Sequence, residues 1–219
     1  MHRRLRARLG LQDDEYVCDA CPRGRKKAEV GGLEAPWIHI LYDVRSLHQL
    51  EDFVGTQFPK VALKPLIDGR ETTSLARFYE EVFKAAPLVN QFGANPDALI
   101  DLIRTFGWGG YAGKQHVLSW FQPEAFLTRE PLAFEMVLDI IVGVSKELLV
   151  GEELDPTFDP NDERDWVSTR LDVVFACNRE VDAIAISELA QNLSDTWRDE
   201  FKSLEIPIEM MRSPRLRSE

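Results

Sequence analysis

Apolar positions recur along the chain with two different periods, and each period predicts one kind of element. Short runs rich in β-branched and aromatic residues predict strands at 37–44, 114–122 and 169–177. Apolar residues spaced three and four positions apart predict helices around these runs. The predicted helices cover 46–58, 72–86, 95–106, 123–130, 131–149 and 187–204. Because helices separate successive strands, we expect an α/β fold with a parallel sheet, in which the strongly apolar third strand takes an interior position.

The segment "FGANPDALIDLIRTFGWGG" (92–110) predicts a helix with well-defined ends. Asn95 is a favourable N-cap, and Pro96 suits the first helical position. Gly107 is placed to end the helix as a C′ residue. The predicted buried side consists of Leu99, Leu102, Ile103 and Phe106.

The opposite side of this helix carries charge. At 100° per residue, Asp97, Asp101 and Arg104 lie away from the apolar face, and Ile100 lies on its flank. Like charges one turn apart weaken a helix by a few tenths of a kcal/mol. Asp97 has a structural explanation in the helix dipole, and Asp101 has one in solubility. Under either explanation, the geometry predicts that both carboxylates are exposed.

The net charge of −11 is unevenly distributed. Residues 1–27 are basic, whereas residues 28–211 carry 15 Lys and Arg against 32 Asp and Glu. An acidic body disfavours nucleic acid and membrane phosphate and attracts basic partners, although the charge alone favours simple solubility as its explanation. No apolar run approaches the ~20 residues of a membrane span, and the arginine-rich start lacks the apolar region of a secretory signal. We therefore expect a cytoplasmic protein with no membrane partner.

Motifs for catalysis are missing from the sequence. Cys18 and Cys21 have the spacing of half a zinc site, but a structural zinc requires four ligands and no second pair is recognisable. Cys177 ends an apolar run, which is typical of an inert buried thiol. The glycines at 107–113 do not fit a phosphate loop, and neither a G-x-S-x-G nor an H-E-x-x-H motif occurs. We expect no enzyme, no cofactor and no metal, with zinc at the two cysteines left open.

The predicted helix resembles the signature helix of the barstar family of ribonuclease inhibitors. The matching residues are Phe92, Gly93, Asn95, Asp97, Ala98, Leu99 and Asp101. "RSLHQLEDF" (45–53) is similar to the helix that follows the family's first strand. The resemblance covers 37–58 and 88–177, and it implies a three-stranded parallel sheet flanked by helices, with an extra helical insertion and a C-terminal helix.

This resemblance also implies a division of the chain. Residues 1–35 are expected to form a basic arm with the CxxC motif, and 36–180 a barstar-like domain with an insertion at 59–91. Residues 181–219 are expected to form a C-terminal helical extension.

The resemblance implies a non-catalytic inhibitor, an immunity protein or antitoxin, whose acidic helix enters the active site of a cationic toxin such as a small ribonuclease. The implied toxin-binding residues are Asp97, Asp101, Asn95, Gly93, Ile100, Arg104 and Trp108. Among the departures from the family pattern, Ile100 replaces a tryptophan, Trp108 comes two residues late, and the aromatic pair before the glycine is reduced to Gln91-Phe92. Two alternatives stay open: a protein-interaction module that uses the insertion or the C-terminal helix, and a nucleic-acid-associated protein that uses the basic arm.

Overall fold

Five parallel strands form a single sheet in the order β2-β3-β4-β1-β5. The computed structural model describes residues 36–85, 93–107, 109–150, 169–201 and 208–213. The strands are β1 (Ile38–Tyr42), β2 (Leu66–Asp68), β3 (Gln115–Phe121), β4 (Arg170–Ala176) and β5 (Ile208–Arg212). β4 is central, as predicted from its apolar run, and every residue of this strand is buried.

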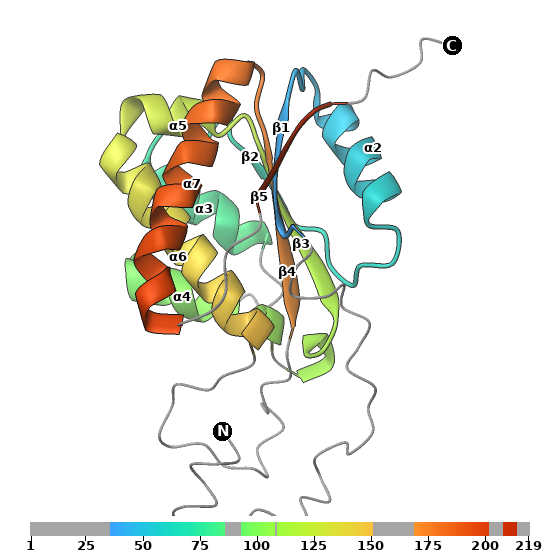
Figure 1. The fold of residues 1–219 in the computed structure, drawn as a ribbon, viewed down its shortest axis with the longest axis vertical. Helices are drawn as coiled ribbons and strands as arrows, with labels where there is room; N and C mark the ends of the chain where they lie inside the picture. The colour runs from blue at the N-terminus through green and yellow to red at the C-terminus, as the bar shows by residue number, and fades with distance from the viewer. Residues whose placement is uncertain (1–35, 86–92, 108, 151–168, 202–207, 214–219) are drawn as a thin grey trace, which may run out of the picture.

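Helices cover both faces of the sheet. The described α-helices are α2 (Leu47–Gln57), α3 (Leu75–Ala85), α4 (Pro96–Arg104), α5 (Glu124–Arg129), α6 (Pro131–Val150) and α7 (Glu180–Phe201). Helices α3 to α7 form a layer on one face, and α2 covers part of the other face (Figure 1). The connections β2-α3-α4-β3 and β3-α5-α6-β4 therefore run along one face, as expected for parallel crossovers.

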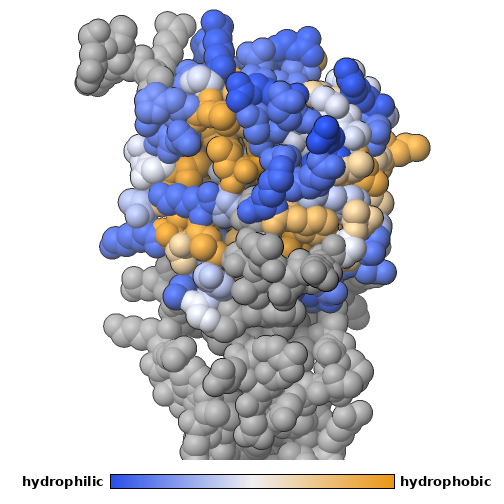
Figure 2. Space-filling view, turned by 180° about the vertical axis from the view of Figure 1, so that it is seen from behind, coloured by the Kyte–Doolittle hydropathy of each residue, from blue (hydrophilic) through white to orange (hydrophobic). Residues whose placement is uncertain are grey.

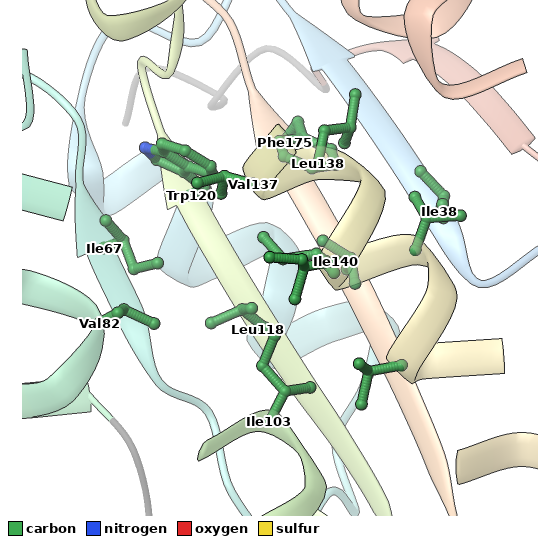
Figure 3. Close-up of a cluster of buried hydrophobic side chains, with 14 of the residues drawn as sticks. Ile38, Ile67, Val82, Ile103, Leu118, Trp120, Val137, Leu138, Ile140 and Phe175 are labelled. Carbon is green, nitrogen blue, oxygen red and sulfur yellow. The ribbon is translucent and has the colours of Figure 1, made fainter. Parts of the chain in front are cut away.

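The larger hydrophobic core lies between the sheet and the layer of α3 to α7. Trp120 of β3 and Phe175 of β4 point toward Val137 and Leu138 of α6 (Figure 3). A second core lies between α2 and the opposite face of the sheet, where Phe53 and Val54 of α2 belong to one cluster with residues of β3 and β4. Alternate residues of each strand thus enter different cores, which fixes the register of the sheet.

The fold confirms the predicted parallel α/β class and the three predicted strands. It differs from the predicted three-stranded sheet by two short edge strands. β2 lies between the predicted helices 46–58 and 72–86, in a segment interpreted as extended or looped, and β5 lies in the region predicted as a helical extension. α7 begins at Glu180, seven residues before the predicted start, and packs against β1 and β5. The C-terminal region is therefore an integral part of the sheet and of the helical layer.

Candidate functional site

The N-terminus of α4 is capped as the sequence predicts. Asn95 has an extended backbone, and its side-chain Oδ1 accepts a hydrogen bond of 2.8 Å from the backbone N–H of Ala98. Pro96 occupies the first helical position, and Asp97 lies in the first turn, where the helix dipole favours a negative charge. The cap and the dipole together stabilise the end of the helix that carries the first aspartate.

The apolar side of α4 fixes the helix to the rest of the molecule. Leu99, Leu102 and Ile103 are buried, as predicted, and Ile103 points toward Leu118 of β3 (Figure 3). Ile100, predicted on the flank, is partly buried against the same core. α4 also packs against α6, so its outward side chains project from an anchored helix.

The outward side of α4 presents both predicted carboxylates to solvent. Asp97 is exposed, and the Asp101 side chain is 54% exposed. The carboxylate of Asp101 lies 3.7 Å from Nη1 of Arg104, a distance too long for a strong ion pair. Two negative charges one helical turn apart therefore remain available on this surface.

Arg104 is directed mainly toward α6. Its Nη2 donates to the carboxylate of Glu147 at 2.9 and 3.2 Å, in a part-buried ion pair. Burial raises the pKa of Glu147 above its ordinary value, although the charge of Arg104 acts in the opposite direction. The sequence prediction placed Arg104 on the acidic face but missed Glu147, because no local pattern relates a residue of α6 to one 43 positions earlier.

The C-terminal end of α4 differs from the prediction. The helix continues as a 3₁₀ turn from Thr105 to Gly107, and among the described glycines a positive φ occurs at Gly113 and not at Gly107. A Cβ at Gly107 would lie 2.7 Å from Cδ2 of Leu148. Gly107 therefore packs closely against Leu148 of α6, and its predicted role as the C′ residue that ends the helix is wrong, because the α-helical C-cap is Thr105.

The loop residues before the helix are placed next to its cap. Gly93 is exposed, and its carbonyl accepts a hydrogen bond of 3.0 Å from the backbone N–H of Asn95. A Cβ at Gly93 would lie 2.8 Å from Nδ2 of Asn95, so a side chain would disturb the cap. The remaining predicted contact, Trp108, lies outside the described residues, as do Cys18 and Cys21.

The described residues contain neither a metal-ligand cluster nor an exposed thiol. No group of three or more His, Cys, Asp or Glu side chains among them could hold a metal ion. Cys177 is fully buried, and burial raises the pKa of its thiol, which disfavours the reactive thiolate. In the part of the chain that the structure describes, every helix is too short or too polar to span a membrane.

The surface of the molecule is mixed in polarity. Figure 2 shows one face, on which polar residues surround several apolar patches.

The fold and the site define a parallel α/β protein that presents two carboxylates on an anchored surface helix. Residues 64–159 match the family model described as Barstar (barnase inhibitor). The predicted resemblance to the barstar family is therefore confirmed for this segment, which includes α4 and the carboxylate pair. The chain matches none of the curated protein sequences compared with it.

The bounds of the family match differ from the segments 37–58 and 88–177 on which the resemblance rests. It begins at residue 64 and so includes β2, α3 and most of the segment 59–91, which we expected to be an insertion. β1 and α2, which we compared with the family's first strand and helix, lie outside the match. In the structure β2 pairs with β3, whereas β1 pairs with β4 and β5. The match therefore contains β2, α3, α4, β3, α5 and α6, whereas β1, α2, β4, α7 and β5 lie outside it.

Proposed function

We propose that this protein is a cytoplasmic immunity protein or antitoxin that inhibits a cationic ribonuclease toxin and has no catalytic activity of its own. The observation that supports the proposal is the pair of exposed carboxylates, Asp97 and Asp101, on a helix whose other side is buried. The family match supports a role like that of a barnase inhibitor. In this proposal α4 enters the active site of the toxin.

The two aspartates act in this proposal as substitutes for phosphate groups of RNA. A ribonuclease active site offers cationic side chains to these groups, and a carboxylate forms short charge-assisted hydrogen bonds with them. The repulsion between Asp97 and Asp101 in the free protein amounts to a few tenths of a kcal/mol. A cationic cleft converts this repulsion into attraction, and opposite charge also accelerates the encounter.

The other predicted contact residues support the two aspartates in different ways. Gly93 and Asn95 shape the start of the helix, and Ile100 offers an apolar surface beside the carboxylates. Arg104 is held by Glu147, which limits its ability to neutralise Asp101. We retain Trp108 as a proposed contact on the sequence pattern.

A binding assay with small basic ribonucleases, barnase among them, tests the proposal. The variant Asp97→Ala/Asp101→Ala is compared with Glu51→Ala/Glu188→Ala, which removes the same charge at two exposed positions on α2 and α7. We expect wild type and control to inhibit a ribonuclease equally. Each α4 truncation should weaken binding by roughly 2–5 kcal/mol, a range calibrated partly on the barnase–barstar pair itself. Equal inhibition by all three proteins would contradict a role of α4, whereas equal losses in both variants would indicate a nonspecific charge effect.

A second candidate function is a protein-interaction module that uses the C-terminal helix. α7 exposes Val181 and Ile184, which are one turn apart and lie outside the segment matched by the family model. The variant Val181→Ser/Ile184→Ser separates the two functions. Loss of a partner in this variant, with retention in Asp97→Ala/Asp101→Ala, would favour the second function. The nucleic-acid alternative depends on residues 1–35, which lie outside the described residues.

A further inference from the structure

A row of polar side chains crosses four strands on the face of the sheet covered by α2. Gln115 of β3 donates to Asp172 of β4 at 2.7 Å, and Nε2 of His39 of β1 lies 3.2 Å from the same carboxylate. Nδ1 of His39 lies 3.4 Å from Oε2 of Glu209 on the edge strand β5. His39 and Glu209 are direct cross-strand partners in the parallel register. The row therefore joins the edge strand to the centre of the sheet.

Asp172 accepts hydrogen bonds from several donors, and these fix its charge. Nε and Nη2 of Arg170 lie 2.8 to 3.0 Å from its carboxylate, in addition to the contacts of Gln115 and His39. Burial raises the pKa of Asp172, but these hydrogen bonds outweigh burial and the pKa is lowered overall. The carboxylate is therefore ionised at neutral pH and acts as an acceptor toward Nε2 of His39.

Both ring nitrogens of His39 consequently face carboxylate oxygens. A neutral imidazole has one N–H donor and one acceptor, whereas the imidazolium has two donors. A neutral ring with its proton on Nε2 would place the lone pair of Nδ1 against Oε2 of Glu209. The second tautomer would place the lone pair of Nε2 against Asp172. Only the imidazolium form makes both contacts, with Asp172 and with Glu209, attractive.

The charges around His39 balance in this protonation state. Arg170 and Asp172 face it from β4, and Glu209 faces it from β5. From the C-terminal end of α2, the ring of Phe58 packs edge-on at 5.2 Å between ring centroids and contributes no charge. The described surroundings thus hold two carboxylates and two cations when His39 is protonated, and an uncompensated negative charge when it is neutral.

We infer that His39 is a protonation-dependent latch that holds the first residues of β5 against β1. Protonated His39 bridges Asp172 and Glu209, and loss of one proton turns one of these contacts into a repulsion. The Glu209 side chain is 44% exposed, so it can rotate into water when the bridge is lost. The far end of β5 is fixed separately by the ion pair of Arg212 with Asp43 and by the hydrogen bond from Ser213 N–H to the Tyr42 carbonyl. Deprotonation therefore loosens residues 208–210 and leaves 211–213 in place.

NMR on the full-length chain tests the latch in two readouts. The ¹⁵N shifts of the His39 ring report whether both nitrogens carry protons, and amide exchange reports the protection of β5, corrected for the intrinsic pH dependence of exchange. The pH is raised from about 5.5 to 8.5, and the ring ¹⁵N shifts locate the step in which His39 changes from two ring protons to one. We expect the protection of 208–210 to fall by roughly tenfold in that same step, as in local opening of an edge element.

Two variants control the experiment. Glu209→Gln retains the strand but removes the second carboxylate, and it should abolish the pH dependence at 208–210. His48→Gln removes an exposed histidine that also lies 3.5 Å from a carboxylate, that of Asp52, and it should leave the β5 step unchanged. A neutral His39 throughout the pH range, or constant protection of 208–210 while His39 titrates, would overturn the inference.

Discussion

The carboxylate of Asp172 and the carboxylates of α4 occupy opposite environments in the same molecule. Asp172 is fully buried and accepts hydrogen bonds from three side chains. Asp97 and Asp101 are exposed, and the Asp101 carboxylate lies 3.7 Å from Nη1 of Arg104. One carboxylate is satisfied inside the fold, and the other two keep most of their hydrogen-bonding capacity for water or a partner.

This difference predicts how much each acidic residue contributes to the free energy of unfolding. Removing a buried charge that other groups depend on leaves those groups unpaired, so the free energy of unfolding falls. Removing an exposed carboxylate on a helix disturbs little of the fold. The α4 aspartates are therefore expected to affect partner affinity far more than stability.

The largest effect on stability is expected for Asp172→Ala. The substitution leaves Arg170 buried without its carboxylate and removes an acceptor from Gln115 and His39, so it should lower the free energy of unfolding by about 3–5 kcal/mol. Urea unfolding followed by circular dichroism measures the change. Asp52→Ala, at a partly exposed position of α2, is the control and should change stability by roughly 0.5 kcal/mol or less. Similar losses in both variants would remove the distinction.

The next largest effect is the loss, in acid, of the stability that ionised Asp172 contributes. Because the folded-state pKa of Asp172 lies below its unfolded value, its ionised form contributes stability that is complete above about pH 4. This contribution is lost as pH falls through the folded-state pKa. The difference in thermal stability between wild type and Asp172→Asn should thus be constant near neutral pH and narrow in acid. If this difference in thermal stability widened in acid, the folded-state pKa of Asp172 would lie above its unfolded value, contrary to the prediction. Glu147 has a raised pKa, so its contribution to the free energy of unfolding should fall as pH rises through the acidic range.

A smaller effect is expected at the start of α4. Asn95→Ala removes the acceptor for the Ala98 N–H and should destabilise the protein by about 1 kcal/mol. Asn95→Ser restores a capping oxygen and should recover most of the loss. Thermal unfolding of the two variants measures the cap, and an identical loss in both would show that the side-chain acceptor is not what stabilises this helix end.

The smallest effect on stability is expected for Asp101→Asn. The substitution relieves repulsion with Asp97 but weakens the long contact with Arg104, so stability should change by roughly 0.5 kcal/mol or less. Inhibition of the target ribonuclease should nevertheless weaken strongly under the proposed function. Calorimetric unfolding and an inhibition assay on the same sample separate the two effects. A large loss of stability would show that Asp101, like Asp172, stabilises the fold.

Local patterns in the sequence predicted α4 in detail, because its signals are local. Asn95, Pro96 and the apolar spacing all lie within one short segment, and the exposure of Asp97 and Asp101 follows from helix geometry. The two edge strands were not predicted, because their local patterns are too short or depend on pairing with a distant strand. β2 has three residues between Pro65 and Gly69, and β5 becomes a strand through pairing with β1. Three residues give too short a pattern for a period of two to be recognised.

The layout and the polar network required information that the local pattern lacks. Two strand–helix units occur in succession, β1-α2 and β2-α3, and both have an apolar run followed by a serine and a helix. The apolar pattern does not show which unit pairs with β3. The cross-strand contact of His39 with Asp172 joins residues 133 positions apart, so it too becomes visible in the folded sheet.

The position of β1 between β4 and β5 has a consequence for synthesis on the ribosome. β1 is made early, yet its described neighbours in the sheet come from the C-terminal part of the chain. At roughly 5–20 residues per second, the 133 residues between His39 and Asp172 take about 7–27 s to translate. During this interval neither β4 nor β5 is available to pair with β1. The nascent chain therefore exposes an apolar strand that is open to chaperones and to aggregation until β4 emerges.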